Sequence, residues 1–283
     1  MKKIKLKWFL ILIVLNLSFL CVKAQKEEPV SIKSGTIKIE GTLLVPEAKE
    51  KVPVVLIIAG SGPTDRNGNG PMINTNCYKM LADELAKSNI ASLRYDKRMI
   101  GKSTDSTLKE SNLKFDDFIK DATLWINYLK KDKRFSDVIV VGHSQGSLVG
   151  MIAAERTKVD KFISLAGVSE SIDQILKKQF SSQPPTVLDV VNPIIDSLAQ
   201  GYMVKNVPIG LYSFFRKDVQ PFLISWMKYN PQTEIAKLKI PVLIVQGTTD
   251  IQTDVDDAKK LHEANKDSKL VMSHRQGELP LAQ

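Results

Sequence analysis

Apolar and polar residues alternate along the chain in blocks that predict strands and helices in turn. Short apolar runs at residues 52–58, 138–141 and 241–245 consist mainly of Val, Ile and Leu, a composition typical of strands buried on both faces of a parallel sheet. At 115–129 and 253–264, apolar residues recur at a spacing of three and four, which predicts amphipathic helices. The pattern therefore predicts an α/β fold with a mostly parallel central sheet flanked by helices.

The same periodicities predict the rest of the core. The further expected elements are a hairpin at 30–46, strands at 90–93, 162–165 and 269–272, and helices around 78–85 and at 145–156.

The alternation of strands and helices breaks between residues 169 and about 233. This stretch contains Met, Phe, Leu and Pro residues without a clear strand, which predicts an inserted helical cap over the carboxyl edge of the sheet. We therefore expect the N-terminal part of the core at 25–168, the cap at 169–235 and the C-terminal part of the core at 236–283.

Residues 1–24 have the order of a secretory signal peptide. Four lysines and no acidic residue at 1–7 precede an apolar run at 8–22, and Val22 and Ala24 offer small or modest residues before a cleavage site. The apolar run is short for a membrane span, which needs about 20 residues. We expect cleavage and export to the periplasm or the medium, without a stable membrane anchor; retention of the segment as an anchor is the alternative.

Composition and charge narrow the choice of partner. With 43% hydrophobic and 25% charged residues, the chain is an ordinary globular protein rather than a disordered or multi-span one. The formal net charge of +9 suggests an anionic partner, but removal of residues 1–24 takes away five lysines and lowers the charge to +4. No basic stripe interleaved with aromatic residues remains, so we expect no nucleic-acid partner. Cys77 is then the one cysteine left, which excludes an intrachain disulfide.

The strongest candidate for chemistry is the segment 142–146, Gly-His-Ser-Gln-Gly. It follows the predicted strand at 138–141 and opens the predicted helix at 145–156, which is the strand–turn–helix context that a G-x-S-x-G nucleophile requires. In that context the serine hydroxyl stands above the sheet edge, and the two glycines let strand and helix approach closely. Ser144 is therefore the candidate nucleophile; a tight turn that contains a serine by chance is the alternative.

A nucleophilic serine needs a base and a carboxylate that orients this base. In this kind of fold the three follow one another in the order Ser, Asp or Glu, His. Asp250 follows the predicted strand at 241–245 through a short turn, which places it at the same sheet edge as Ser144. The alternative for Asp250 is an N-cap of the helix that follows.

The candidate for the base is one of the chain's three histidines. His143 lies inside the motif and His262 lies within a predicted helix, whereas His274 follows the last predicted strand. His274 is therefore the candidate base by elimination.

Four parts of the chain together resemble the α/β-hydrolases, and among them the bacterial EstD-type carboxylesterases and the serine-aminopeptidase-like (S33) lipase and esterase group. These parts are 59–66, 94–98 with 101–103, 142–146 and 240–250, within a resemblance that extends from about residue 30 to 272. The resemblance implies an α/β-hydrolase fold with a cap.

The resemblance also implies further site residues. It makes 59–62 the oxyanion loop, so that the backbone N–H groups of Ser61 and Gln145 receive the substrate's oxyanion. The alternative for this loop is a glycine-rich phosphate turn, which is disfavoured because no lysine follows at P-loop spacing. Asp96 and Arg98 are expected to be structural and to pair within their loop.

The C-terminal part, 236–283, departs from the family pattern. His274 arrives a few residues early, and 275–283 leave no room for the usual final helix. We expect an atypical C-terminal part, such as a truncation, a frameshift or a genuine variant would produce. If the base is missing, activity would be orders of magnitude lower.

These features together predict an exported serine hydrolase, a carboxylic ester hydrolase that forms an acyl-enzyme on Ser144. A peptidase or thioesterase on the same scaffold and a degenerate homologue that binds ligands without catalysis are the alternatives. The expected partner is a small-molecule ester or acyl substrate, and the mechanism needs no metal or organic cofactor. In the predicted cap, four aromatic residues suggest a pocket for medium or bulky apolar acyl groups: Phe214, Phe215, Phe222 and Trp226.

Overall fold

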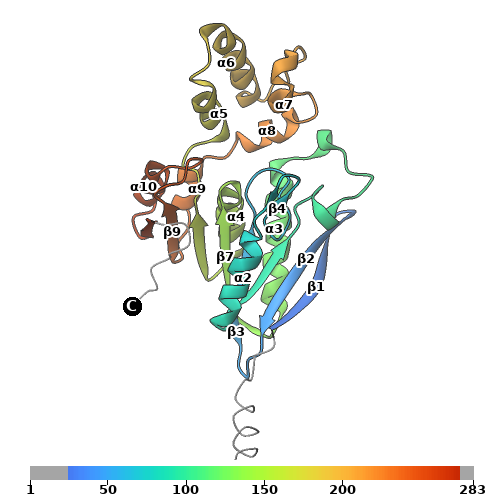
Figure 1. The fold of residues 1–283 in the computed structure, drawn as a ribbon, viewed down its shortest axis with the longest axis vertical. Helices are drawn as coiled ribbons and strands as arrows, with labels where there is room; N and C mark the ends of the chain where they lie inside the picture. The colour runs from blue at the N-terminus through green and yellow to red at the C-terminus, as the bar shows by residue number, and fades with distance from the viewer. Residues whose placement is uncertain (1–24, 275–283) are drawn as a thin grey trace, which may run out of the picture.

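A computed structural model describes residues 25–274 of the 283-residue chain (Figure 1). Within this range eight strands form one sheet, in the order β1 (Gln25–Ser34), β2 (Ile37–Pro46), β6 (Ala91–Tyr95), β3 (Val52–Ile58), β7 (Phe135–His143), β8 (Lys161–Leu165), β9 (Val242–Gly247) and β10 (Lys269–Ser273). The β1–β2 and β2–β6 pairs are antiparallel and the other neighbours are parallel. The predicted mostly parallel sheet is confirmed. The predicted signal peptide at 1–24 and the segment 275–283 lie outside the described residues.

The central strands are buried on both faces, as their unbroken apolar runs predict. Every residue of β6 is buried, and β3 is buried from Val54 to Ile58. In β2, by contrast, Ile37 and Ile39 are buried while Lys38 between them is exposed. The hairpin therefore has one face on the core and one face in solvent, which is common for antiparallel strands.

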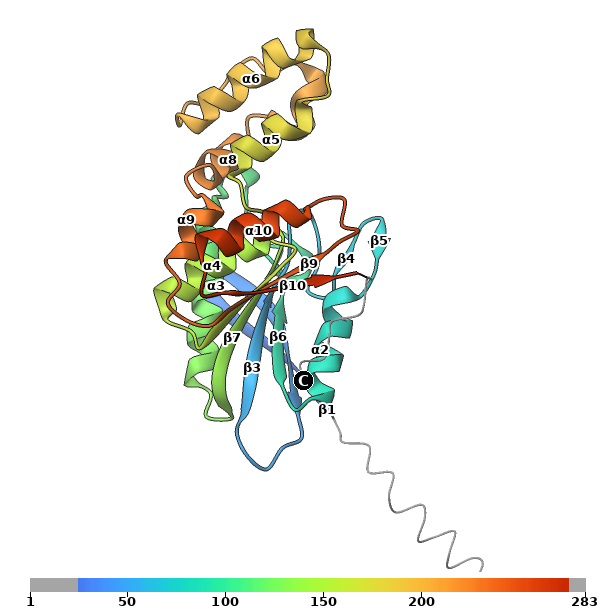
Figure 2. The ribbon, with the colours of Figure 1, turned by 90° about the vertical axis from the view of Figure 1, so that its left-hand side faces the viewer.

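Helices cover both faces of the sheet (Figure 2). On one face lies α2 (Cys77–Lys87), whose Ala82 and Ala86 share an apolar cluster with Val55 and Ile57 of β3. The other face is covered by α3 (Phe115–Lys131), α4 (Gln145–Thr157), α9 (Pro231–Ala236) and α10 (Val255–Ala264). The buried apolar area between these layers is the main stabilising contribution to the fold.

A separate group of helices stands beyond the carboxyl edge of the sheet (Figure 1). It consists of α5 (Ile172–Phe180), α6 (Pro185–Ala199), α7 (Tyr212–Phe215) and α8 (Gln220–Trp226). This helical segment has its own apolar core, in which Val191, Ile195 and Phe215 are fully buried. Helix α8 joins it to the main core, because Trp226 stacks on Phe115 of α3 with ring centroids 5.3 Å apart.

Several short elements were not predicted. They are the small hairpin of β4 (Asn69–Gly70) and β5 (Ile73–Asn74) and the 3₁₀ turns η1 (Gly101–Ser103), η2 (Glu110–Asn112) and η3 (Ile209–Leu211). Elements of two or three residues are too short to show a periodicity. No helix in residues 25–274 is both long enough and apolar enough to cross a membrane.

Candidate active site

Ser144 lies at the turn between β7 and α4. Its φ of 51° and ψ of −120° are values that residues with a side chain rarely adopt. A Cβ atom on Gly142 would lie 2.3 Å from the carbonyl oxygen of Gly146, and one on Gly146 would lie 2.4 Å from that of Ile58. The close approach of helix and strands therefore requires both glycines, and it holds Ser144 in a strained turn at the sheet edge.

The segment 59–62 lies directly against this turn. A Cβ atom on Gly60 would lie 3.4 Å from Cβ of Ser144. Within the described part of the chain, the amides of Ser61 and Gln145 donate no hydrogen bond. Gln145 is the first residue of α4, where an amide has no intrahelical acceptor and the helix dipole favours negative charge. Two amide donors are thus available close to Ser144.

Tyr78 and His143 hold the segment 59–62 in place through hydrogen bonds. The Tyr78 hydroxyl accepts a hydrogen bond from the Gly60 amide at 3.0 Å and lies 2.8 Å from Nδ1 of His143. Burial lowers the pKa of His143 below its usual 6.5 and raises the pKa of Tyr78 to about 12. At neutral pH the imidazole is therefore neutral, and its Nδ1 shares one hydrogen bond with the hydroxyl group of Tyr78.

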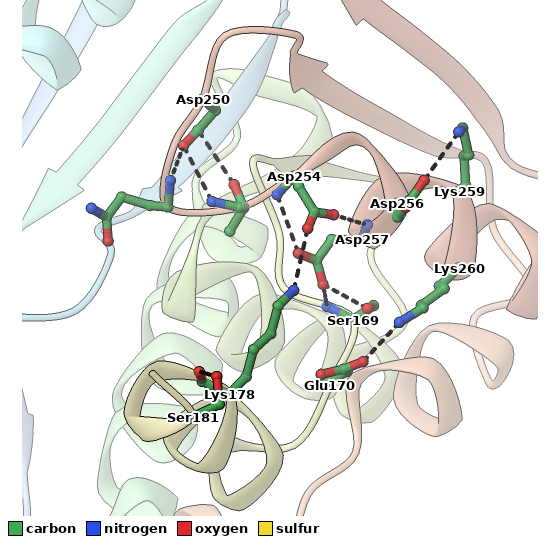
Figure 3. A network of polar contacts seen from close by, with 12 residues as sticks. Ser169, Glu170, Lys178, Ser181, Asp250, Asp254, Asp256, Asp257, Lys259 and Lys260 are labelled. Carbon is green, nitrogen blue, oxygen red and sulfur yellow. Dashed lines mark hydrogen bonds and ion pairs between the residues drawn. The ribbon is translucent and has the colours of Figure 1, made fainter. Parts of the chain in front are cut away.

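Asp250 lies in the loop after β9, and its carboxylate is bonded to its own loop (Figure 3). Oδ1 accepts hydrogen bonds from the amides of Gln252 at 2.8 Å and Thr253 at 3.2 Å, and Oδ2 accepts one from the Thr253 hydroxyl at 3.3 Å. Helix α10 is capped instead by Asp254, which accepts from the amide of Asp257 at 3.0 Å. The alternative interpretation of Asp250 as the helix cap is therefore wrong.

His274 is exposed and directly follows β10, the parallel neighbour of β9. The carbonyl of Ser273 accepts a hydrogen bond from the amide of Thr248 at 2.8 Å, so the chain leaves both strands at the same end. No hydrogen bond in the described part of the chain joins Ser144, Asp250 and His274. The structure brings the three residues to one edge of the sheet but does not connect them.

A cavity of about 390 Å³ opens beside Gln145, between the core and the helical segment. Its walls are mostly apolar, and they come from the loop after β6, the η2 region, α3 and the start of α8. The lining residues are Gly62, Lys97, Arg98, Met99, Ile100, Glu110, Leu113, Phe118, Gln145, Val219 and Phe222. Of the four cap aromatics predicted to shape a pocket, Phe222 lines this cavity, whereas Phe214 lines a separate groove within the helical segment.

Two buried ion pairs hold the loop after β6. Asp96 Oδ2 accepts from Nη2 of Arg66 at 2.7 Å, and Arg98 binds Asp121 through Nε at 2.6 Å and Nη2 at 2.8 Å. The expected pairing of Asp96 with Arg98 is therefore wrong, because each residue pairs with a different part of the chain. Both partners of each pair are buried, and this pairing offsets the cost of taking their charges out of water.

A family model described as serine aminopeptidase, S33, matches residues 70–213, about half of the chain. The chain belongs to this S33 family. The matched range contains Ser144 but neither Asp250 nor His274.

Individual proteins are similar to this S33 protein in sequence or in fold. Esterase EstD of Thermotoga maritima is 25% identical over 244 residues, which are 81% of this chain and 55% of EstD. The chain therefore spans about half the length of this curated relative. Est1E of Butyrivibrio proteoclasticus, solved with ferulic acid bound, superimposes with a TM-score of 0.63 at 20% identity, over 86% of this chain and 88% of Est1E.

An α/β-hydrolase from a Penicillium species superimposes with a TM-score of 0.60 at 16% identity, over 87% of this chain and 89% of that one. These likenesses confirm the predicted α/β-hydrolase fold of the S33 protein. In residues 25–274, no group of three or more His, Cys, Asp or Glu side chains is arranged to hold a metal ion.

Two residues that contact the loop 59–62 were not predicted. They are Tyr78, which lies at the start of the predicted helix at 78–85, and Lys97, which lies in the segment 94–98. A lysine that lies two residues after a fully buried strand and is itself 5% exposed is unusual. That position after the strand was the one signal in the sequence that pointed to Lys97.

Proposed function

We propose that this protein is a serine hydrolase that cleaves carboxylic esters through an acyl-enzyme on Ser144. The observation that carries the proposal is the strained turn at Ser144 with the amides of Ser61 and Gln145 close to it. Acyl transfer needs a nucleophile with nearby donors that stabilise the oxyanion of the tetrahedral intermediate. The membership of the S33 family and the similarity to an esterase support the same reaction class.

In this mechanism Oγ of Ser144 attacks the ester carbonyl carbon while His274 takes the hydroxyl proton. The intermediate collapses, His274 gives its proton to the leaving alcohol, and the acyl group stays on Ser144. Water then attacks the acyl-enzyme with His274 as base, which releases the acid. Asp250 orients the imidazole and stabilises its cation. The position of both residues after neighbouring strands supports this assignment.

The cavity beside Gln145 indicates the acyl group. Met99, Ile100, Leu113 and Phe222 give it apolar walls, which favour a medium or bulky apolar acyl chain over acetate. Est1E, with a similar fold, binds ferulic acid, and an aromatic acyl group of that kind suits this cavity.

The proposal includes export. The segment 1–24, with its lysines, apolar run and small residues before Gln25, would direct the chain to the periplasm or the medium. Protein sequencing of material secreted by or extracted from the producing cell tests this point: a mature N-terminus at Gln25 is expected, and an intact Met1 in the membrane fraction would contradict cleavage.

Hydrolysis of nitrophenyl acetate, nitrophenyl butyrate and methyl ferulate tests the function. We expect the purified protein to cleave these esters and Ser144→Ala to reduce the rate to the background. Equal rates for the two proteins would reject the proposal. Parallel assays with an aminoacyl nitroanilide and an acyl thioester show whether peptidase or thioesterase activity exceeds esterase activity.

A ligand-binding homologue without catalysis is the second candidate. One observation favours it: within the described part of the chain, Ser144, Asp250 and His274 share no hydrogen bond. A fluorophosphonate probe separates the two, because it labels an activated serine. Labelling that Ser144→Ala abolishes supports the enzyme, and its absence in the wild-type protein supports the binding protein.

A further inference from the structure

Lys97 is a buried lysine with no carboxylate partner among the described residues. It lies in the loop after β6 and is 5% exposed. Its Nζ donates to two carbonyl oxygens, that of Gly60 and that of Gly62, the latter at 3.1 Å. The ring of Phe118 lies on another side of the ammonium group, with its centroid 5.8 Å away. Burying an unpaired cation is costly, so its presence calls for a role.

The two carbonyl groups flank Ser61, the proposed oxyanion donor. The carbonyl of Gly60 and the amide of Ser61 belong to one peptide group. Because a trans peptide is planar, its C=O and N–H point in opposite directions. A hydrogen bond that fixes the carbonyl of Gly60 therefore also fixes the direction of the Ser61 N–H.

A charged donor also changes the electronic character of this peptide group. Hydrogen bonds that share one group polarise one another, and the effect is larger where water is excluded. An ammonium group at the carbonyl oxygen draws electron density from the amide nitrogen, which makes the N–H a stronger donor toward a developing oxyanion.

We propose that Lys97 is a positioning residue of the oxyanion hole, whose ammonium group orients and polarises the Gly60–Ser61 peptide. The inference rests on the proposed function, since it requires Ser61 to receive the oxyanion. Tyr78 completes the support from the other side of Gly60, through its hydrogen bond from the Gly60 amide. Both peptide groups of Gly60 are thus held by side chains of other elements.

The variant Lys97→Met tests this role, because it keeps the length and bulk of the side chain and removes the charged donor. We expect kcat for nitrophenyl butyrate to fall about 100-fold, the lower range for loss of an oxyanion donor, with KM within about twofold. The affinity for a trifluoromethyl ketone, which forms an oxyanion on the serine, should fall by the same factor as kcat/KM. A kcat equal to that of the wild-type protein, or a rise in KM alone, would overturn the proposal.

Lys130→Met is the matched control. Lys130 also donates to two carbonyl oxygens, those of Thr157 at 2.6 Å and Lys158 at 2.8 Å, but it is exposed and lies in the last turn of α3, beside the C-terminal end of α4. The control should keep the wild-type kcat. If the wild-type protein and Ser144→Ala are equally inactive, the proposed function fails; if the wild-type protein is active and Lys97→Met is equally active, the positioning role alone fails.

A measurement on the wild-type protein decides the matter if Lys97→Met does not fold. Burial lowers the pKa of Lys97 to about 8, so kcat should fall as the pH rises through about 8 and the ammonium loses its proton. The neighbouring groups do not change their charge in this pH range. Arg98 stays charged and Glu110 is paired with Arg216. The pKa of His143 lies below 8 and that of Tyr78 lies above it. A kcat that stays constant from pH 7 to 9.5 would overturn the proposal.

Discussion

The amide of Thr248 donates a hydrogen bond to the carbonyl of Ser273 at 2.8 Å, one residue before His274. This bond continues the parallel pairing of β9 with β10, which ends with Gly247 opposite Ser273. The loop that carries Asp250 and the residue that carries the proposed base therefore start side by side. The proposed triad requires the two side chains to meet at this edge.

His274→Ala tests whether His274 is the base. We expect kcat for ester hydrolysis to fall by about 10²–10⁴-fold, the usual contribution of a general base, with little change in stability because the side chain is exposed. The measurement is steady-state hydrolysis of nitrophenyl butyrate.

The control for that experiment is His262→Ala. His262 lies on α10 and its Nδ1 is 2.8 Å from the Ser268 hydroxyl, so its loss should affect local packing and leave kcat unchanged. An active His274→Ala protein would show that the base is another group.

Gly146→Ala tests the close approach at the nucleophile turn. The added methyl group would lie 2.4 Å and 2.6 Å from the carbonyl oxygens of Ile58 and Ala59, which are backbone atoms at the end of β3. Strand and helix have to separate, at a cost of about 2–3 kcal/mol in the free energy of unfolding. Urea unfolding measures this cost. The control Gly210→Ala has nothing within 4 Å of its added methyl group and should change stability by less than about 0.5 kcal/mol; equal effects would contradict the argument.

The core of the fold could be predicted because it depends on patterns that are local in the sequence. The apolar run of β3, from Val52 to Ile58, was predicted with its final bounds, since a strand buried on both faces has no polar positions. In β7, the strand begins at Phe135 and not at residue 138. Ser136 and Asp137, which lie on this extension, are polar and concealed it.

The site could be predicted only where its residues lie within three positions of the end of a strand. The positions of Ser144 and Asp250 depend on that local order, so they could be read from the sequence. The contacts of Lys97 and Tyr78 with Gly60 cross 37 and 18 residues and depend on how distant elements pack. No spacing in the sequence encodes such contacts, and the same holds for the pairing of Asp96 with Arg66.

His143 should make the protein sensitive to mild acid. Burial lowers its pKa in the folded state below the 6.5 expected in the unfolded chain, so below pH 6.5 the unfolded chain binds more protons. Stability therefore falls as the pH drops from 6.5, with a slope of at most about 1.4 kcal/mol per pH unit for one proton. In His143→Gln, which keeps a hydrogen-bonding group for Tyr78 but does not titrate, thermal unfolding between pH 7 and pH 5 should show a smaller decrease in stability. An identical decrease in both proteins would assign the acid sensitivity elsewhere.

Leu113→Trp tests whether the cavity beside Gln145 holds the acyl group. Leu113 lines this cavity, and the larger side chain would occupy part of its volume of about 390 Å³. A single methylene group that no longer fits is worth about 10- to 200-fold in selectivity, so kcat/KM for methyl ferulate and nitrophenyl octanoate should fall by at least that order while nitrophenyl acetate is unaffected.

The matched control for the cavity is Leu211→Trp, because Leu211 lines the separate groove of the helical segment together with Phe180 and Phe214. This variant should have the wild-type kcat/KM for all three esters. An equal loss for acetate and octanoate in Leu113→Trp would mean that the substitution disturbs the catalytic turn and not the acyl pocket. A loss confined to the octanoate and ferulate esters in Leu211→Trp would place the acyl group in the groove of the helical segment instead, because volume removed from a pocket penalises only the groups that fill it.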